Sequence, residues 1–104
     1  MASTSILKQR VKISPDVLFQ EISGECVLLD LKSENYFGLD EVGTRIWQLI
    51  EECGGELRTV FDRMAAEYHV DSAVLERDLK DLMTRLCDNG LIEILSVETN
   101  EQKD

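Results

Sequence analysis

Short apolar runs alternate with turn residues in the first part of the chain. The runs are VLFQEI from Val17, CVLLDL from Cys26 and YFGL from Tyr36, and the segments SGE and KSEN separate them. Short apolar runs bounded by small and polar residues are typical of strands joined by tight turns. The pattern predicts a three-stranded antiparallel sheet near the N-terminus.

The middle run of this sheet presents apolar side chains in both directions. Successive side chains of a strand point to opposite faces. One face therefore has Val27, Leu29 and Leu31, and the opposite face has Cys26, Leu28 and Asp30. Since both faces are partly apolar, we expect the sheet to be partly covered on its second side as well.

From Asp40 onward the apolar residues follow a helical period. Asp40 is a suitable N-cap for a first helix, which the pair Gly54 and Gly55 ends. A second helix is predicted from about Glu56 to Tyr68, because its apolar residues fall on one side. These residues are Leu57, Val60, Phe61, Met64 and Tyr68.

The third predicted helix has the clearest boundaries. Asp71 or Ser72 caps its start, and the segment from Asp88 to Gly90 supplies the stop. Its apolar stripe consists of Leu75, Leu79, Leu82 and Leu86. The following LIEIL segment predicts a short C-terminal strand.

This order of elements predicts an α+β fold of the winged helix-turn-helix type. An N-terminal three-stranded antiparallel sheet precedes three helices and a short C-terminal strand. We expect a flexible N-terminus over residues 1–10, a single domain over residues 11–97 and a disordered polar tail over residues 98–104. A chain of 104 residues is long enough for one compact core and too short for two ordinary domains.

A winged helix raises the alternative of a DNA-binding transcriptional regulator, and the charge of the chain opposes it. In such proteins the third helix enters the major groove. Here the segment from Asp71 to Asp88 has five acidic residues against three basic ones, and the whole chain has a net charge of -10. Phosphates would meet net repulsion, because affinity for DNA depends on Lys and Arg. We therefore expect no nucleic-acid partner.

The chain has no recognisable catalytic motif. Its one histidine, His69, falls in a turn between two predicted helices, and no nucleophile elbow, phosphate loop or zinc-protease motif occurs. Cys26, Cys53 and Cys87 are far apart and odd in number, which favours neither disulfides nor a zinc site. We expect no enzymatic activity, no metal and no cofactor. Without an apolar signal or membrane-spanning segment, a cytoplasmic location without a membrane partner is expected.

The chain resembles the PqqD family over nearly all of residues 17–94. The resemblance is carried by VLLDLKSENYFGLDEVGTRIWQLI, the Gly-Gly turn, the LERDLKDLMTRL segment and the final NGLIE. The YFGL, EVG and IW elements look most like the broad part of the family that includes stand-alone leader-binding proteins of lasso-peptide pathways. The match to the member that serves pyrroloquinoline quinone (PQQ) biosynthesis is looser.

This resemblance implies a peptide chaperone, a recognition element for ribosomally synthesised and post-translationally modified peptides. Family members bind the leader of a precursor peptide as an added strand between the third strand and the third helix. They then present the peptide to a modifying enzyme, often a radical S-adenosylmethionine enzyme, or to a leader peptidase.

The strand edge from Asn35 to Leu39 is the first part of the expected site. An exposed edge offers unpaired backbone groups to an extended peptide, and Gly38 would allow close approach of another backbone. Alternatively, Gly38 marks a bulge at the end of the strand. Phe37 and Leu39 are assigned to the core, with Trp47 behind them, so Tyr36 is expected to line the groove. The alternative for Tyr36 is a half-buried surface aromatic.

One flank of the third helix is the second part of the expected site. With the leucine stripe facing inward, helical geometry groups Val74, Asp78, Asp81 and Arg85 on one flank. Asp78 also matches an aspartate that the resemblance places here. The alternative is an ordinary solvated face held by helical ion pairs. Lys80, Met83 and Cys87 fall on the other flank.

Overall fold

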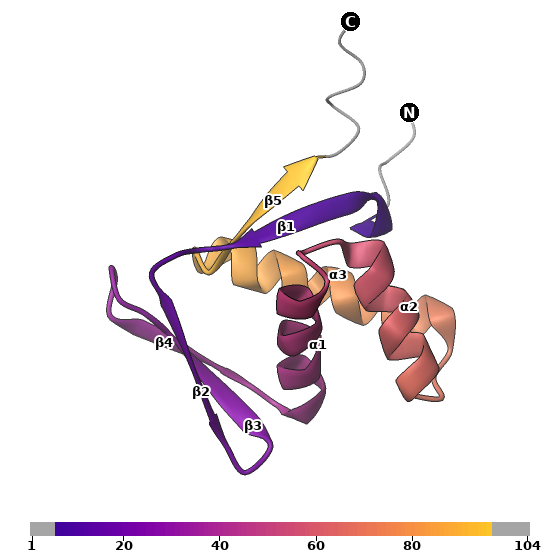
Figure 1. Ribbon diagram of the computed structural model, residues 1–104, viewed down its shortest axis with the longest axis horizontal. Coiled ribbons are helices and arrows are strands. Elements are labelled where there is room, and N and C mark those ends of the chain that lie inside the picture. Colours follow the sequence, from indigo (N-terminus) through magenta and orange to yellow (C-terminus); the bar gives the residue numbers. More distant parts are fainter. Residues whose placement is uncertain (1–5, 97–104) are drawn as a thin grey trace, which may run out of the picture.

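The computed structural model describes residues 6–96, which form an α+β fold (Figure 1). The elements in chain order are the 3-10 helix η1 (Ile6–Lys8), the strands β1 (Gln9–Ile13), β2 (Val17–Ile22), β3 (Glu25–Asp30) and β4 (Asn35–Leu39), the helices α1 (Glu41–Glu52), α2 (Leu57–Glu67) and α3 (Ser72–Asp88), and the strand β5 (Ile92–Ser96). The expected tail over residues 98–104 lies outside the described residues. Within the described part, no helix is long and apolar enough to cross a membrane.

The strands form two separate antiparallel sheets. The predicted meander is confirmed, with strand order β2-β3-β4. The predicted C-terminal strand is also present as β5, but it pairs with β1, a strand that the sequence pattern did not predict. Residues 6–10 were expected to be flexible, and they instead form η1 and the first two residues of β1. This β1–β5 ribbon lies along the helices at the top of the view in Figure 1, where β1 contacts α2 and β5 contacts α3, and the meander lies at the lower left.

The winged helix-turn-helix expectation fits the structure only in part. The three helices follow in the expected order, and Asp71 caps α3 by accepting a hydrogen bond from the Ala73 N–H at 3.1 Å. The segment after α3 is a single strand that returns to β1, so it forms no hairpin with a neighbouring strand in sequence. The fold is therefore best described by its two sheets and three helices.

The inner face of the three-stranded sheet is buried and its outer face is open. Cys26, Leu28 and Leu39 are buried on the inner face, which packs against α1. On the outer face, the side chains of Leu18 and Tyr36 are 52% and 76% exposed. The expectation that the second face is partly covered is therefore wrong for residues 6–96, and apolar side chains face solvent there.

The helices build the core against both sheets. The predicted leucine stripe of α3 is buried, but the buried face is wider than predicted because Met83, assigned to the flank away from the expected site, is fully buried. On α2 the predicted apolar side is confirmed, with Leu57, Val60 and Met64 buried and the two aromatic residues partly buried against the core. All buried apolar side chains of the described residues belong to one cluster.

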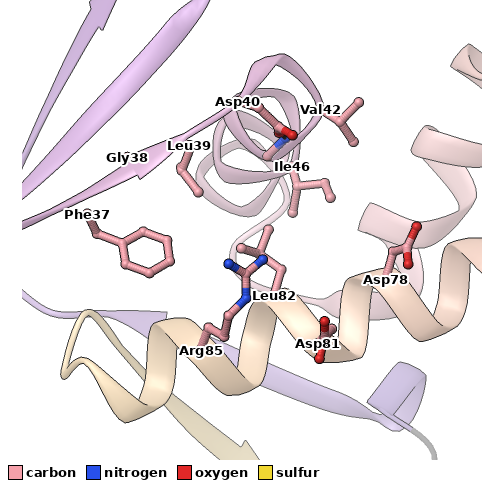
Figure 2. Close-up of a pocket in the computed structure, with 11 residues that line it drawn as sticks. Phe37, Gly38, Leu39, Asp40, Val42, Ile46, Asp78, Asp81, Leu82 and Arg85 are labelled. Atoms are coloured by element: carbon pink, nitrogen blue, oxygen red, sulfur yellow. Dashed lines mark hydrogen bonds between the residues drawn. The ribbon is translucent and has the colours of Figure 1, made fainter.

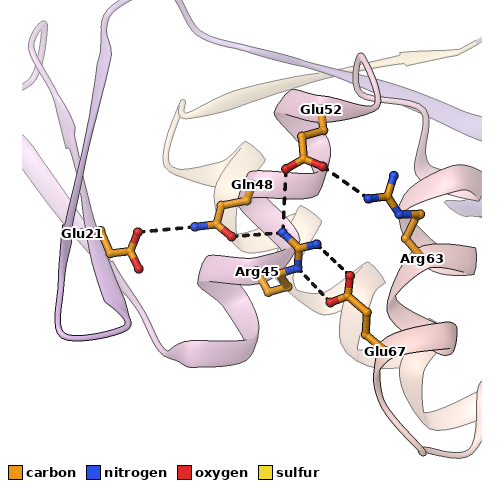
Figure 3. Close-up of polar contacts among 6 residues, drawn as sticks. All are labelled: Glu21, Arg45, Gln48, Glu52, Arg63 and Glu67. Atoms are coloured by element: carbon orange, nitrogen blue, oxygen red, sulfur yellow. Dashed lines mark hydrogen bonds and ion pairs between the residues drawn. The ribbon is translucent and has the colours of Figure 1, made fainter.

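A polar network holds α1 in place between the sheet and α2 (Figure 3). The guanidinium of Arg45 donates two hydrogen bonds, of 2.8 and 2.7 Å, to the carboxylate of Glu67 on α2. These bonds lower the pKa of Glu67 and raise that of Arg45. Gln48 accepts a third bond from Arg45 and donates one to Glu21 on β2, at 3.2 and 3.4 Å. Three elements are thus tied together through α1, which supplies one wall of the groove described next.

Candidate functional site

A groove of about 450 Å³ opens between β4, the start of α1 and α3. Figure 2 shows its side chains converging from these three elements. The lining residues are Phe37, Gly38, Leu39, Asp40, Val42, Gly43, Ile46, Asp78, Asp81, Leu82 and Arg85. Its floor is apolar, and the charged groups come from α3 and from Asp40, the residue between β4 and α1.

The junction between β4 and α1 fixes the near wall of this groove. Asp40 is the N-cap of α1, as predicted, and its side chain accepts a hydrogen bond from the Gly43 N–H at 2.8 Å. The buried hydroxyl of Thr44 donates to the Leu39 carbonyl at 3.4 Å. A Cβ at Gly43 would lie only 3.1 Å from the Leu39 side chain. The first turn of α1 therefore packs closely on the end of β4.

The free edge of β4 presents backbone groups at alternate residues. In the β2–β3 hairpin, Ile22 pairs with Glu25 across a two-residue turn, so this pair exchanges hydrogen bonds. The alternation then directs the groups of Cys26, Leu28 and Asp30 toward β4, where they pair with Leu39, Phe37 and Asn35. The N–H and C=O groups of Tyr36 and Gly38 consequently point away from β3, toward the open edge.

Gly38 does not mark a bulge. The pairing of β4 with β3 runs from Asn35 to Leu39 without interruption. A Cβ built at Gly38 meets nothing within 4 Å, and the residue does not have a positive φ. Neither the packing nor the backbone conformation of this chain requires glycine at this position.

The structure brings most of the predicted site residues together. Phe37, Gly38, Leu39, Asp78, Asp81 and Arg85 line the groove, whereas Asn35, Tyr36 and Val74 do not. Phe37 packs against the core as predicted, whereas Tyr36 is not on the face where the sequence placed it. Tyr36 points to the outer face and does not line the groove, whereas the partly buried Phe37 both contacts the core and forms part of the groove wall. Tyr36 reaches the site only through its backbone.

Sequence reasoning missed the groove residues supplied by α1. Asp40 was predicted only as a cap, and neither Val42 nor Ile46 was predicted to belong to the site. Leu82 was assigned to the core, and it is both buried and part of the groove floor. The helical period shows that these residues lie on one face, but not that this face is shared between the core and a groove.

The charged groups of the groove are largely available to a ligand. The Arg85 guanidinium lies over the Phe37 ring, with its central carbon 5.8 Å from the ring centroid, and no ion pair among residues 6–96 joins it to Asp81 (Figure 2). Such an exposed cation–π contact contributes only about 0.5–1 kcal/mol. Asp78 and Asp81 have no ion-pair partner within the described residues. With Asp40, the groove contains three carboxylates and one guanidinium.

The remaining chemistry-bearing residues do not gather at this groove. His69 is exposed at the turn between α2 and α3. Within residues 6–96, no three His, Cys, Asp or Glu side chains are placed to bind one metal ion. The groove itself offers an apolar floor, a strand edge and fixed charges, which suit binding of an extended chain better than bond-making chemistry.

Comparison with known proteins assigns the chain to a family. Residues 25–92 match the family model described as coenzyme PQQ synthesis protein D (PqqD). A solved structure of TbiB1 in complex with the TbiA(beta) leader peptide is 46% identical, with a TM-score of 0.74, over 79% of this chain and 94% of that one. A lasso peptide synthetase B1 complexed with its leader peptide is 27% identical, with a TM-score of 0.72, over 81% and 98% of the two chains. Among the curated proteins none matches. The family match spans more than half of the chain, which therefore belongs to the PqqD family.

Proposed function

We propose that this protein binds the leader segment of a ribosomally synthesised precursor peptide. The leader joins the three-stranded sheet as a fourth strand on β4 and lies in the groove between β4 and α3. The protein then presents the bound precursor to an enzyme that modifies or cleaves it. In this role it acts as a peptide chaperone and carries out no chemistry of its own.

The observation that carries this proposal is the open edge of β4 beside a groove with an apolar floor and charged walls. Tyr36 and Gly38 direct their backbone groups to that edge, where an extended peptide would satisfy them. Side chains on one side of the added strand would then enter the groove above Leu39, Ile46 and Leu82. Backbone pairing would provide sequence-independent affinity, and these side-chain contacts would select the peptide.

The charges of the groove favour a leader with a basic residue facing α3. Asp78 and Asp81 both line the groove from α3, and a Lys or Arg side chain there would pair with two carboxylates that have no ion-pair partner among residues 6–96. Arg85 would bind a carboxylate or carbonyl of the peptide, at the small cost of leaving the Phe37 ring. The same excess of carboxylates gives no support to DNA binding.

The two structural neighbours support leader binding and indicate the type of pathway. Both were solved with leader peptides, and both align with most of this chain. The 46% identical one is TbiB1, and the other is a lasso peptide synthetase component. We therefore infer that the precursor is that of a lasso peptide rather than that of the PQQ pathway.

The outer face of the sheet is a suitable surface for the enzyme partner. Leu18, Val27 and Tyr36 expose apolar side chains there. Because an added strand would extend the same sheet, an enzyme docked on this face would lie next to the bound leader. A leader peptidase and a radical S-adenosylmethionine enzyme are the two classes of partner to test. The experiment compares how much of each enzyme co-purifies with the wild type and with a Leu18→Glu variant in the presence of leader.

A peptide titration tests the proposed function. The leader of the precursor encoded beside this gene is added to ¹⁵N-labelled protein, and affinity is measured in parallel by calorimetry. We expect a Kd of about 1 μM or tighter, with chemical-shift changes concentrated at Asn35–Leu39 and at Asp78 to Arg85. Changes confined to α2 or to the β1–β5 ribbon would contradict the proposal. A peptide with the same composition in scrambled order is the control.

A further inference from the structure

Gly38 lies in a row of outer-face residues that runs across the three strands. Gln20 on β2 pairs with Val27 on β3, and Val27 pairs with Gly38 on β4. Directly paired residues point to the same face of a sheet. At the free edge this row therefore ends in a position without a side chain, although nothing in the fold prevents one from being there.

The missing side chain leaves a hollow on the outer face. This hollow has a volume of about 460 Å³ and is lined by Ile22, Glu25, Cys26, Val27, Gly38, Leu39 and Asp40. Ile22 and Val27 are 63% and 37% exposed, so its walls include apolar surface that residues 6–96 leave open. The hollow and the groove meet at Gly38, Leu39 and Asp40, which line both, whereas Ile22, Glu25 and Val27 line the hollow alone.

A peptide strand added to β4 would bring one of its side chains to this hollow. The peptide residue paired with Gly38 would have its Cβ on the outer face, about 5 Å from the glycine Cα. A large side chain at that position can lean across a glycine and cover the neighbouring strand, a pairing that stabilises sheets in which a glycine lies opposite an aromatic residue. Here it would reach Val27 and Ile22.

We infer that the hollow over Gly38 is a subsite for one bulky apolar side chain of the bound leader, preferably aromatic, at the position paired with Gly38. The inference rests on the proposed addition of the leader to β4. The subsite also accounts for glycine at position 38, which the fold itself does not require. The absence of a side chain there leaves room for the ligand. Replacing that peptide residue by alanine should weaken binding about tenfold, because part of an aromatic surface would no longer be buried.

A selection experiment tests this subsite and does not require the sequence of the precursor. A library of randomised 14-residue peptides displayed on their encoding mRNA is selected on the full chain. The register of the enriched peptides on β4 is then fixed by nuclear Overhauser contacts to the Tyr36 and Gly38 amides. We expect Phe, Tyr, Trp or Leu to be enriched at the position paired with Gly38, and contacts from that side chain to the Val27 methyl groups.

Two variants separate the subsite from a general effect on the sheet. Gly38→Val places a branched side chain at the position paired with the peptide residue, and it should fold because a Cβ there meets nothing within 4 Å. Selection on it should favour small residues at the paired position. Gln20→Val adds the same side chain to the same row at the far strand, and it should leave the preference unchanged.

The outcomes distinguish the subsite from the proposed function. The subsite is wrong if the selected peptides bind β4 without a size preference at the position paired with Gly38. It is also wrong if peptides selected on Gly38→Val show the same preference as those selected on the wild type. Both results leave leader binding intact. A preference lost equally with Gln20→Val also overturns it. If no selected peptide contacts β4, both the subsite and the proposed strand addition are wrong.

Discussion

Substitution of Tyr36 by proline removes one backbone donor from the open edge of β4. The Tyr36 N–H points away from β3, because the hydrogen-bonded pairs of the ladder fall at Asn35, Phe37 and Leu39. Proline is tolerated on edge strands at positions whose N–H faces outward. The variant Tyr36→Pro should therefore lose a contact to the leader without losing one to the fold. Phe37→Pro, one residue further on, would remove a bond to β3 and destabilise the sheet.

The size of the effect follows from the single hydrogen bond that is lost. A typical bond of this kind contributes about 0.5–1.5 kcal/mol net, which corresponds to a change of about 2- to 13-fold in Kd. The tyrosine side chain is 76% exposed, so its loss should change the free energy of unfolding little. Tyr36→Ala is the matched control, since it removes the side chain and keeps the N–H.

Calorimetric titration with one leader peptide compares the two variants. Tyr36→Pro should bind about 2- to 13-fold more weakly than Tyr36→Ala, whereas urea unfolding should place the two within about 1 kcal/mol of each other. If both variants bind the leader equally well, the Tyr36 N–H does not bond to the peptide, and either the register or strand addition itself is wrong. A large loss of stability in Tyr36→Pro would instead refute the assignment of inward and outward groups on β4.

Three further predictions concern the close packing of a turn, a buried thiol and the charges of the groove. Gly54 and Gly55 both have positive φ, but only at Gly55 would a Cβ overlap the backbone carbonyl of β1. Gly55→Ala should therefore lower the free energy of unfolding by at least twice the roughly 1 kcal/mol expected for Gly54→Ala. Equal losses of stability in urea unfolding would contradict this packing. Burial raises the pKa of the Cys26 thiol above its ordinary value of 9.0. Its contribution to stability is therefore complete below about pH 9 and declines above it, because the thiol ionises first in the unfolded chain. A Cys26→Ala variant should lose less stability between pH 8 and pH 10 than the wild type, and an equal decline would rule this out. Replacing Asp78 and Asp81 together by asparagine should weaken binding of a leader with a basic residue about two- to fivefold at low salt. It should also reduce the dependence of the Kd on salt concentration. If that dependence is unchanged, neither carboxylate faces the basic residue.

The local elements were predictable because their signals are local. Turn residues separate the strands of the meander, and Asp40 and Asp71 cap their helices as the sequence indicates. The strand β1 has a comparable signal, since Val11 is buried and its neighbours Arg10 and Lys12 are exposed. Its pairing partner, however, is at the other end of the chain, and no local pattern specifies such a pairing.

The site was predictable only in outline. Helical geometry grouped Asp78, Asp81 and Arg85 correctly, since spacing alone fixes a helix face. The aromatics of β4 were harder to place, because their roles depend on how the core and the groove share one face of the sheet. Phe37 pairs with the buried Leu28, so it belongs to the inner face, where the groove also opens.

Hydrogen exchange at two amides tests strand addition most directly. In the free protein the amides of Tyr36 and Gly38 face the open edge, whereas that of Phe37 bonds to β3. Exchange is followed by NMR with and without saturating leader peptide. We predict that the leader slows exchange at Tyr36 and Gly38 by at least about tenfold more than at Phe37. Binding that leaves exchange at these two amides unchanged would show that the peptide does not add to β4.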